Sequence, residues 1–93
     1  MAQRTVIVAS ASGLHARPAK LFVQAAARLG VPVTVRLGEK AVPAKSMLGV
    51  LSLGAAHGAE VTLEADGPGA EEALDSLVAL LSRDLDAEEA LDA

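Results

Sequence analysis

The amino-acid sequence predicts an α+β protein, an open-faced two-layer sandwich with the element order β-α-β-β-α-β-α. Several short segments alternate apolar with polar residues, which is typical of strands that bury one face. Between them, other segments repeat apolar residues at three- and four-residue spacing, which is typical of amphipathic helices. Alternating strands favour a sheet with one wet face and with helices covering the other face.

The first strand is expected over residues 4–9, where β-branched side chains favour extended backbone. A helix is expected from Pro18, because proline fits the first turn of a helix, where its missing N–H costs nothing. Gly30 is the natural end of this helix. Its predicted buried face consists of Leu21, Phe22, Ala25, Ala26 and Leu29.

A hairpin is expected to follow. Residues 31–37 alternate apolar and polar side chains, which predicts a half-buried strand. Gly38 suits the first central position of a two-residue turn. A short strand over residues 40–42 completes the hairpin, and Pro43 confines its end to a sheet edge or a break.

The second half of the chain predicts two helices around one strand. Ser46 is the simplest N-cap for a short helix over residues 47–53, which Gly54 ends. Residues 60–65 alternate cleanly and predict the last strand. The final helix is expected to bury Ala70, Ala73, Leu74, Leu77, Val78 and Leu81.

The length of 93 residues allows one domain over residues 1–93, and residues 84–93 are expected to form a frayed acidic tail. There is no run of roughly 20 apolar residues that could cross a bilayer and no signal-peptide pattern at the start. The chain has no cysteine, which excludes disulfides and thiolate chemistry. These features predict a cytoplasmic protein without membrane insertion.

Charge is divided unevenly along the chain. Residues 1–45 hold seven of the eight basic residues, whereas residues 46–93 hold eleven of the twelve acidic residues. Nucleic acid is not an expected partner, because the chain lacks a dense basic stripe and has one aromatic residue, Phe22. The basic half is suited to an acidic protein partner.

The candidate site is the stretch Gly13-Leu14-His15-Ala16-Arg17-Pro18. It places His15 at a helix N-terminus, where unpaired N–H groups favour an anion. The positive helix end lowers the pKa of a histidine, which keeps the imidazole neutral and nucleophilic. Arg17 adds a forked donor for phosphate oxygens. These residues suit a phosphoryl carrier, but the residues alone equally allow a histidine that only makes a hydrogen bond at the start of a helix.

Two motifs at a matching separation resemble one family. Gly13 to Ala19 is similar to the active-site signature of the HPr family, the histidine-containing phosphocarriers of the bacterial phosphoenolpyruvate-dependent sugar phosphotransferase system. Ala44 to Gly54 is similar to the regulatory-serine segment of that family. The resemblance covers essentially residues 1–83 and implies a four-stranded antiparallel sheet in the order 1-4-2-3, with three helices on one face.

The resemblance also implies a mechanism. His15 would accept a phosphoryl group on Nδ1 from enzyme I and pass it to the IIA domain of a sugar permease. Arg17 would balance the phosphate charge, and Ser12 and Ala16 would contact the phosphate. Such a protein is a carrier with a phosphohistidine intermediate rather than a free-standing enzyme. It is expected to need no metal and no cofactor and to act as a monomer.

Ser46 has two interpretations. Its position predicts a helix N-cap, and it also resembles the serine that HPr kinase/phosphorylase modifies in many relatives. A partner-docking surface is also implied around the two helices, with Met47 and Leu48 expected to be exposed. The implied docking residues are Lys20, Gln24, Lys45, Met47, Leu48 and Leu51. Gln24, Ala27 and Pro43 depart from residues common in the family, and these departures concern the choice of partner, not the chemistry.

Two alternatives remain open at this point. One is an HPr-like carrier that serves a nitrogen-related or regulatory branch of phosphotransfer. The other is a regulatory module that binds an anion at His15 and Arg17 without forming a covalent bond. His57 is expected to lie exposed in a loop, and two distant histidines without cysteine do not suggest a metal site.

Overall fold

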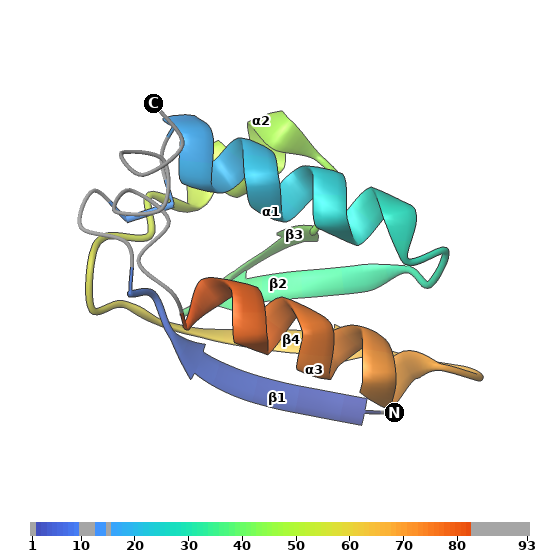
Figure 1. Cartoon of the computed structure of the whole chain (residues 1–93). Coiled ribbons are helices and arrows are strands. Elements are labelled where there is room, and N and C mark those ends of the chain that lie inside the picture. Colours follow the sequence, from blue (N-terminus) through green and yellow to red (C-terminus); the bar gives the residue numbers. More distant parts are fainter. Residues whose placement is uncertain (1, 10–12, 15, 83–93) are drawn as a thin grey trace.

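The computed structural model describes residues 2–9, 13–14 and 16–82. It forms one four-stranded antiparallel sheet in the order β1-β4-β2-β3, and the three helices lie on one side of it (Figure 1). The predicted fold class, element order and strand order are therefore confirmed. The elements are β1 Ala2–Ile7, α1 Ala16–Arg28, β2 Val33–Leu37, β3 Lys40–Pro43, α2 Met47–Leu53, β4 Glu60–Ala65 and α3 Ala70–Leu81.

Strand β4 forms the centre of the sheet, and its alternating sequence sets the register. Leu63 lies opposite Arg4 of β1 and opposite Val35 of β2. The apolar residues of β4, Val61, Leu63 and Ala65, are all buried, whereas Glu60 is exposed. A slip of one residue would turn this apolar set towards water, so the pattern fixes the pairing.

The core lies between the sheet and the helices. Phe22 of α1 is fully buried, together with Leu74 and Leu77 of α3 and Leu63 of β4. The apolar face predicted for α1 is correct at its centre, with Phe22 and Ala26 buried and its other members half-buried. Val78, predicted to be buried on α3, is only half-buried, because it lies at the margin of the buried stripe of that helix.

Four predicted boundaries are wrong by two residues: both ends of β1 and the starts of β2 and α1. Strand β1 begins at Ala2 and ends at Ile7, because the backbone of Val8 bonds to the loop before β4 instead of to β4 itself. Strand β2 begins at Val33 instead of residue 31. Helix α1 begins at Ala16, two residues before Pro18, and the ring of Pro18 is buried inside its first turn.

The other predicted ends are correct or nearly so: β3 extends one residue further than predicted, to Pro43, and α1 ends at Arg28, two residues before Gly30. Gly38 has a positive φ of 61° and makes the two-residue turn between β2 and β3. Pro43 lies opposite Thr34 on the edge strand β3, where a missing N–H is tolerated. Strand β4 and helix α2 have the predicted bounds. The predicted acidic tail, residues 84–93, lies outside the described residues.

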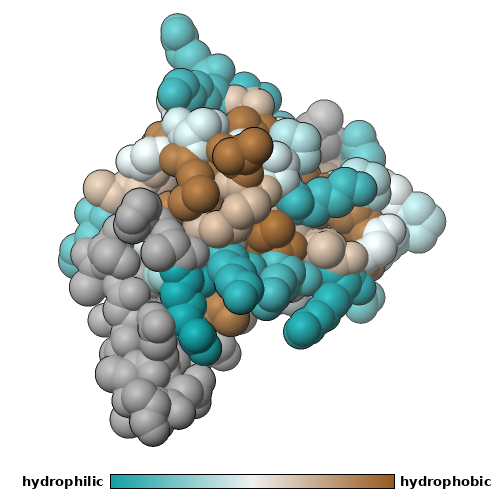
Figure 2. All heavy atoms as spheres, turned by 90° about the horizontal axis from the view of Figure 1, so that it is seen from above, coloured by the Kyte–Doolittle hydropathy of each residue, from teal (hydrophilic) through white to brown (hydrophobic). Residues whose placement is uncertain are grey.

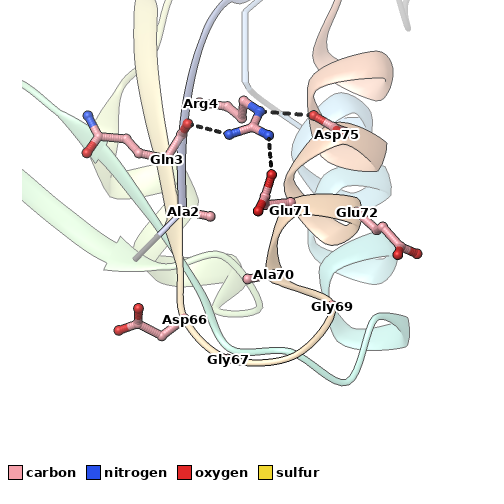
Figure 3. Close-up of a pocket in the computed structure, with 10 residues that line it drawn as sticks. All are labelled: Ala2, Gln3, Arg4, Asp66, Gly67, Gly69, Ala70, Glu71, Glu72 and Asp75. Carbon is pink, nitrogen blue, oxygen red and sulfur yellow. Dashed lines mark hydrogen bonds and ion pairs between the residues drawn. The ribbon is translucent and has the colours of Figure 1, made fainter.

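Helix α3 is fastened to the edge strand β1 by one arginine. Arg4 Nε donates to Asp75 Oδ1 at 3.0 Å, and Arg4 Nη2 lies 3.5 Å from Glu71 Oε1 (Figure 3). These atoms line an open, largely acidic hollow at the start of α3, at the other end of the sheet from the start of α1. The arrangement is a surface ion-pair network that holds a helix on a strand.

Candidate functional site

The site begins with the N-terminus of α1. Because this helix starts at Ala16, the amide groups of its first turn have no partner within the helix. Arg17 is exposed in that same turn, and Pro18 lacks an N–H that would otherwise need a partner. His15 and Ser12 lie outside the described residues, and so does the side chain of Ala16. The described part of the site therefore consists of a helix N-terminus with an exposed guanidinium.

Gly13 and Leu14, which precede His15 in the chain, are fixed by a turn and by a buried hydrogen bond. Gly13 has a positive φ of 74°, which glycine adopts without strain. Leu14 is almost fully buried, and its amide N–H donates to the carbonyl oxygen of Ala55 at 2.8 Å. The sequence indicated the turn at Gly13, but it gave no sign that Ala55 would be its partner. A glycine packed against backbone leaves no pattern in the sequence of the segment it contacts.

Helix α2 has both ends fixed by the residues that the sequence indicates. Ser46 has extended backbone, and its Oγ accepts from the amide N–H of Gly49 at 3.1 Å. At the other end Gly54 adopts the left-handed conformation, with φ 65°, and donates to the carbonyl oxygen of Leu51. The predicted N-cap and C-cap are both confirmed.

Helices α1 and α2 pack against each other on the same side of the sheet (Figure 1). The two sequence motifs, more than twenty residues apart, therefore lie on neighbouring elements. Their exposed residues belong to one face of the molecule. Figure 2, which looks down on this helical face, shows a group of apolar residues with hydrophilic residues around it.

Exposure differs among the six residues expected to dock a partner. Leu48 is 82% exposed, which confirms its predicted exposure. The predicted exposure of Met47 is wrong, because its side chain is half-buried against the core. Leu51 is half-buried in the same way. Lys20, Gln24 and Lys45 are exposed.

Among the described residues, His57 and the acidic side chains do not form a metal centre. His57 is exposed in the loop between α2 and β4, as predicted. Within residues 2–9, 13–14 and 16–82, no group of three His, Cys, Asp or Glu residues could hold a metal ion. In the same part of the chain, no helix is long and apolar enough to cross a membrane.

Fold and site together define a class of protein: a small open-faced α+β sandwich in which a histidine directly precedes a helix with an exposed arginine in its first turn. Comparison with known proteins agrees with this class. The family model described as "PTS HPr component phosphorylation site" matches residues 2–83. The chain belongs to the HPr family, the phosphocarriers of the phosphotransferase system.

Relatives cover nearly the whole chain. The phosphocarrier protein HPr of Streptomyces coelicolor is 51% identical over 87 residues, which are 92% of this chain and 94% of that protein. The crystal structure of HPr-C-His from Thermoanaerobacter tengcongensis is 43% identical and superposes with a TM-score of 0.83, covering 87% of this chain and 91% of that one. A phosphocarrier protein HPr from Bacillus anthracis is 41% identical with a TM-score of 0.83, covering 86% and 95%.

Proposed function

We propose that this chain accepts a phosphoryl group on Nδ1 of His15 from the phosphohistidine of enzyme I and donates it to the IIA domain of a sugar permease. The observation that carries the proposal is the start of α1 at Ala16, directly after His15 in the chain, with Arg17 exposed in the same turn. The amide groups of a helix N-terminus and a guanidinium are the groups that a phosphate at this point requires.

The chemistry is a transfer between two imidazoles. The lone pair of a neutral His15 nitrogen attacks phosphorus, a new N–P bond forms, and the N–P bond to the enzyme I histidine breaks. The electron pair of the broken bond returns to the donor imidazole. Arg17 balances the charge of the phosphoryl oxygens, and the amides of the first helical turn, beginning with Ala16, add hydrogen-bond donors. Ser12 is a further phosphate contact in this proposal, and no metal or soluble cofactor takes part.

The exposed faces of α1 and α2 are the proposed docking surface. Leu48 is an exposed apolar residue on α2, and Lys20 and Lys45 are exposed cations that suit an acidic partner surface. Gln24, Met47 and Leu51 complete the set. Ser46 is the proposed regulatory site for an HPr kinase/phosphorylase, because a phosphate there adds about −1.5 to −2 charge beside this surface.

Phosphorylation by enzyme I and phosphoenolpyruvate tests the proposal. The wild-type protein should gain the mass of one phosphoryl group in an acid-labile form. His15→Ala should gain none, whereas His57→Ala, which changes the other histidine of the chain, should gain it at the wild-type rate. Label on His15→Ala would overturn the assignment.

The same reaction separates the alternatives. A protein that binds phosphate reversibly, without an N–P bond, would support the regulatory anion-binding module. If His15 is phosphorylated but sugar IIA domains do not accept the group, and a nitrogen-related IIA domain does, the carrier belongs to a regulatory branch. The proposal also includes a single domain over residues 1–93 that acts in the cytoplasm as a monomer, which light scattering and cell fractionation test.

A further inference from the structure

One short loop forms hydrogen bonds with Val8 and with Leu14, the two ends of the segment that precedes His15 in the chain. This buttress loop, defined as residues 54–59, runs from the end of α2 to the start of β4. At one end of the segment, Val8 N–H donates to the carbonyl oxygen of Ala59 at 2.9 Å, and Val8 C=O accepts from Gly58 N–H at 2.9 Å. At the other end, Leu14 N–H donates to the carbonyl oxygen of Ala55 at 2.8 Å.

The contact at Gly13 leaves no space for a side chain. A Cβ atom built there would overlap the carbonyl oxygen of Ala55 and would lie 2.8 Å from the Cα atom of Ala56. Both obstacles are backbone atoms, which cannot rotate away as a flexible side chain could. Gly13 therefore combines a positive φ with direct packing of backbone on backbone.

The buttress loop is itself fixed. Gly54 ends α2 in the left-handed conformation, and Ala59 N–H donates to the carbonyl oxygen of Ala56 at 2.9 Å. Ala55 is 3% exposed and Leu14 is 2% exposed, so water has little access to the bond between them. A hydrogen bond shielded in this way is stronger than an exposed one and holds a definite geometry.

We propose that the buttress loop is a positioning element for phosphoryl transfer, acting through the carbonyl oxygen of Ala55 on Leu14, the residue before His15. The inference rests on the proposed function of His15. Ala55 and Gly13 are positioning residues: they fix the backbone at Leu14, the residue that precedes the nucleophile in the chain. In-line transfer is sensitive to such placement, and an error of about 1 Å costs about 100-fold in rate.

Gly13→Ala tests this positioning role, with Gly30→Ala as the matched control. Gly30 has a similar φ of 69°, but a Cβ atom there would meet nothing within 4 Å, so the control carries the backbone strain without the collision. The measurement is the steady-state rate of phosphorylation by enzyme I at varied concentrations of folded carrier. Gly13→Ala should lower kcat by about 10- to 100-fold with KM within about threefold of wild type. Gly30→Ala should keep both constants near wild type.

A backbone substitution keeps the test decisive if Gly13→Ala does not fold. Replacing the amide N–H of Leu14 by an ester oxygen removes the donor to Ala55 and leaves every side chain intact. The same ester at Ala44 removes a buried bond of equal length, 2.8 Å to the carbonyl oxygen of Val33 at the start of β2. Both esters should lower the Tm by a similar amount, because each removes one buried hydrogen bond of the same length. The Leu14 ester should also lower kcat about tenfold or more, whereas the Ala44 ester should leave kcat unchanged.

Two results have separate meanings. Normal kcat in both Gly13→Ala and the Leu14 ester would overturn the positioning role and leave the proposed function intact. Failure of the wild-type protein to form phosphohistidine would overturn the proposed function itself. The second result is seen in the wild-type reaction alone, so the two failures are distinguishable.

Discussion

Ser46 Oγ accepts a hydrogen bond from the backbone N–H of Gly49, at 3.1 Å, and this bond closes the first turn of α2. The same oxygen is the atom that a serine kinase would modify. A phosphate on Oγ would bring further acceptors and negative charge to the positive end of the helix, which favours the helix. Modification at Ser46 is therefore expected to change the charge of the docking surface rather than to unfold α2.

Ser46→Ala should lower the free energy of unfolding by about 1 kcal/mol, because the N–H of Gly49 loses its partner. In a domain of this size such a loss lowers Tm by about 4–8 °C, which thermal unfolding followed by circular dichroism measures. Ser52→Ala is the matched control: its hydroxyl donates to the carbonyl oxygen of Gly49 from an exposed position inside the helix. A loss for Ser52→Ala equal to that for Ser46→Ala would contradict the capping role.

Ser46→Asp should keep the stability of the wild-type protein, because aspartate is as good an N-cap as serine. Its negative charge should raise the KM for phosphorylation by enzyme I if the partner surface is acidic, as the exposed lysines suggest. The rise in KM should fade as salt is added, since exposed charges are screened. A KM that does not depend on salt would contradict the electrostatic explanation.

Arg17→Ala should slow phosphorylation of His15 by about tenfold or more, the value of a charge-assisted hydrogen bond to a phosphate oxygen. Its Tm should stay close to wild type, because Arg17 is exposed. Arg28→Ala is the matched control, since Arg28 is an exposed arginine in the last turn of the same helix. A large fall in Tm for Arg17→Ala would indicate a structural role instead.

The helix and strand bounds were predicted accurately from the sequence where the signal is local. Local signals were sufficient for α2, whose bounds are set by Ser46 and Gly54, and for β4, whose alternation is complete. They failed at β1, because Val8 has the composition of a strand residue but bonds to the loop at Gly58 and Ala59. Contacts of that kind depend on the whole fold.

The site was predictable to a similar extent. Gly13 and Pro18 placed Arg17 at the helix N-terminus, although α1 starts two residues before Pro18. The role of Ala55 could not be predicted, because a carbonyl oxygen belongs to every residue and has no signature in the sequence. Met47 was misjudged for a related reason: in a short helix with apolar residues around most of its circumference, periodicity does not say which residue faces the core.

Phe22→Ala should lower the free energy of unfolding by about 3–5 kcal/mol, because Phe22 is fully buried and its removal leaves a cavity. Domains of this kind have about 5–15 kcal/mol in total, so the variant should be close to unfolding. Urea unfolding followed by circular dichroism is the measurement, since the chain has neither tryptophan nor tyrosine for fluorescence. Phe22→Leu fills most of the space and should lose clearly less free energy of unfolding. Equal losses for the two variants would mean that stability at this core position does not depend on side-chain volume.

Leu48→Ala should weaken docking without weakening the fold. Leu48 is 82% exposed, so the loss of its side chain should change stability by less than about 0.5 kcal/mol. If the residue is buried against enzyme I, the KM for phosphorylation should rise about 5- to 10-fold, the equivalent of about 1 kcal/mol or slightly more of lost apolar contact. Ile7→Ala is the matched control, because Ile7 is 49% exposed and lies on β1, at the edge of the sheet. The proposed docking of enzyme I at the N-terminal turn of α1 would bring it against α1 and the neighbouring helix α2. An unchanged KM for Leu48→Ala, or an equal rise for Ile7→Ala, would therefore move the docking surface away from α2.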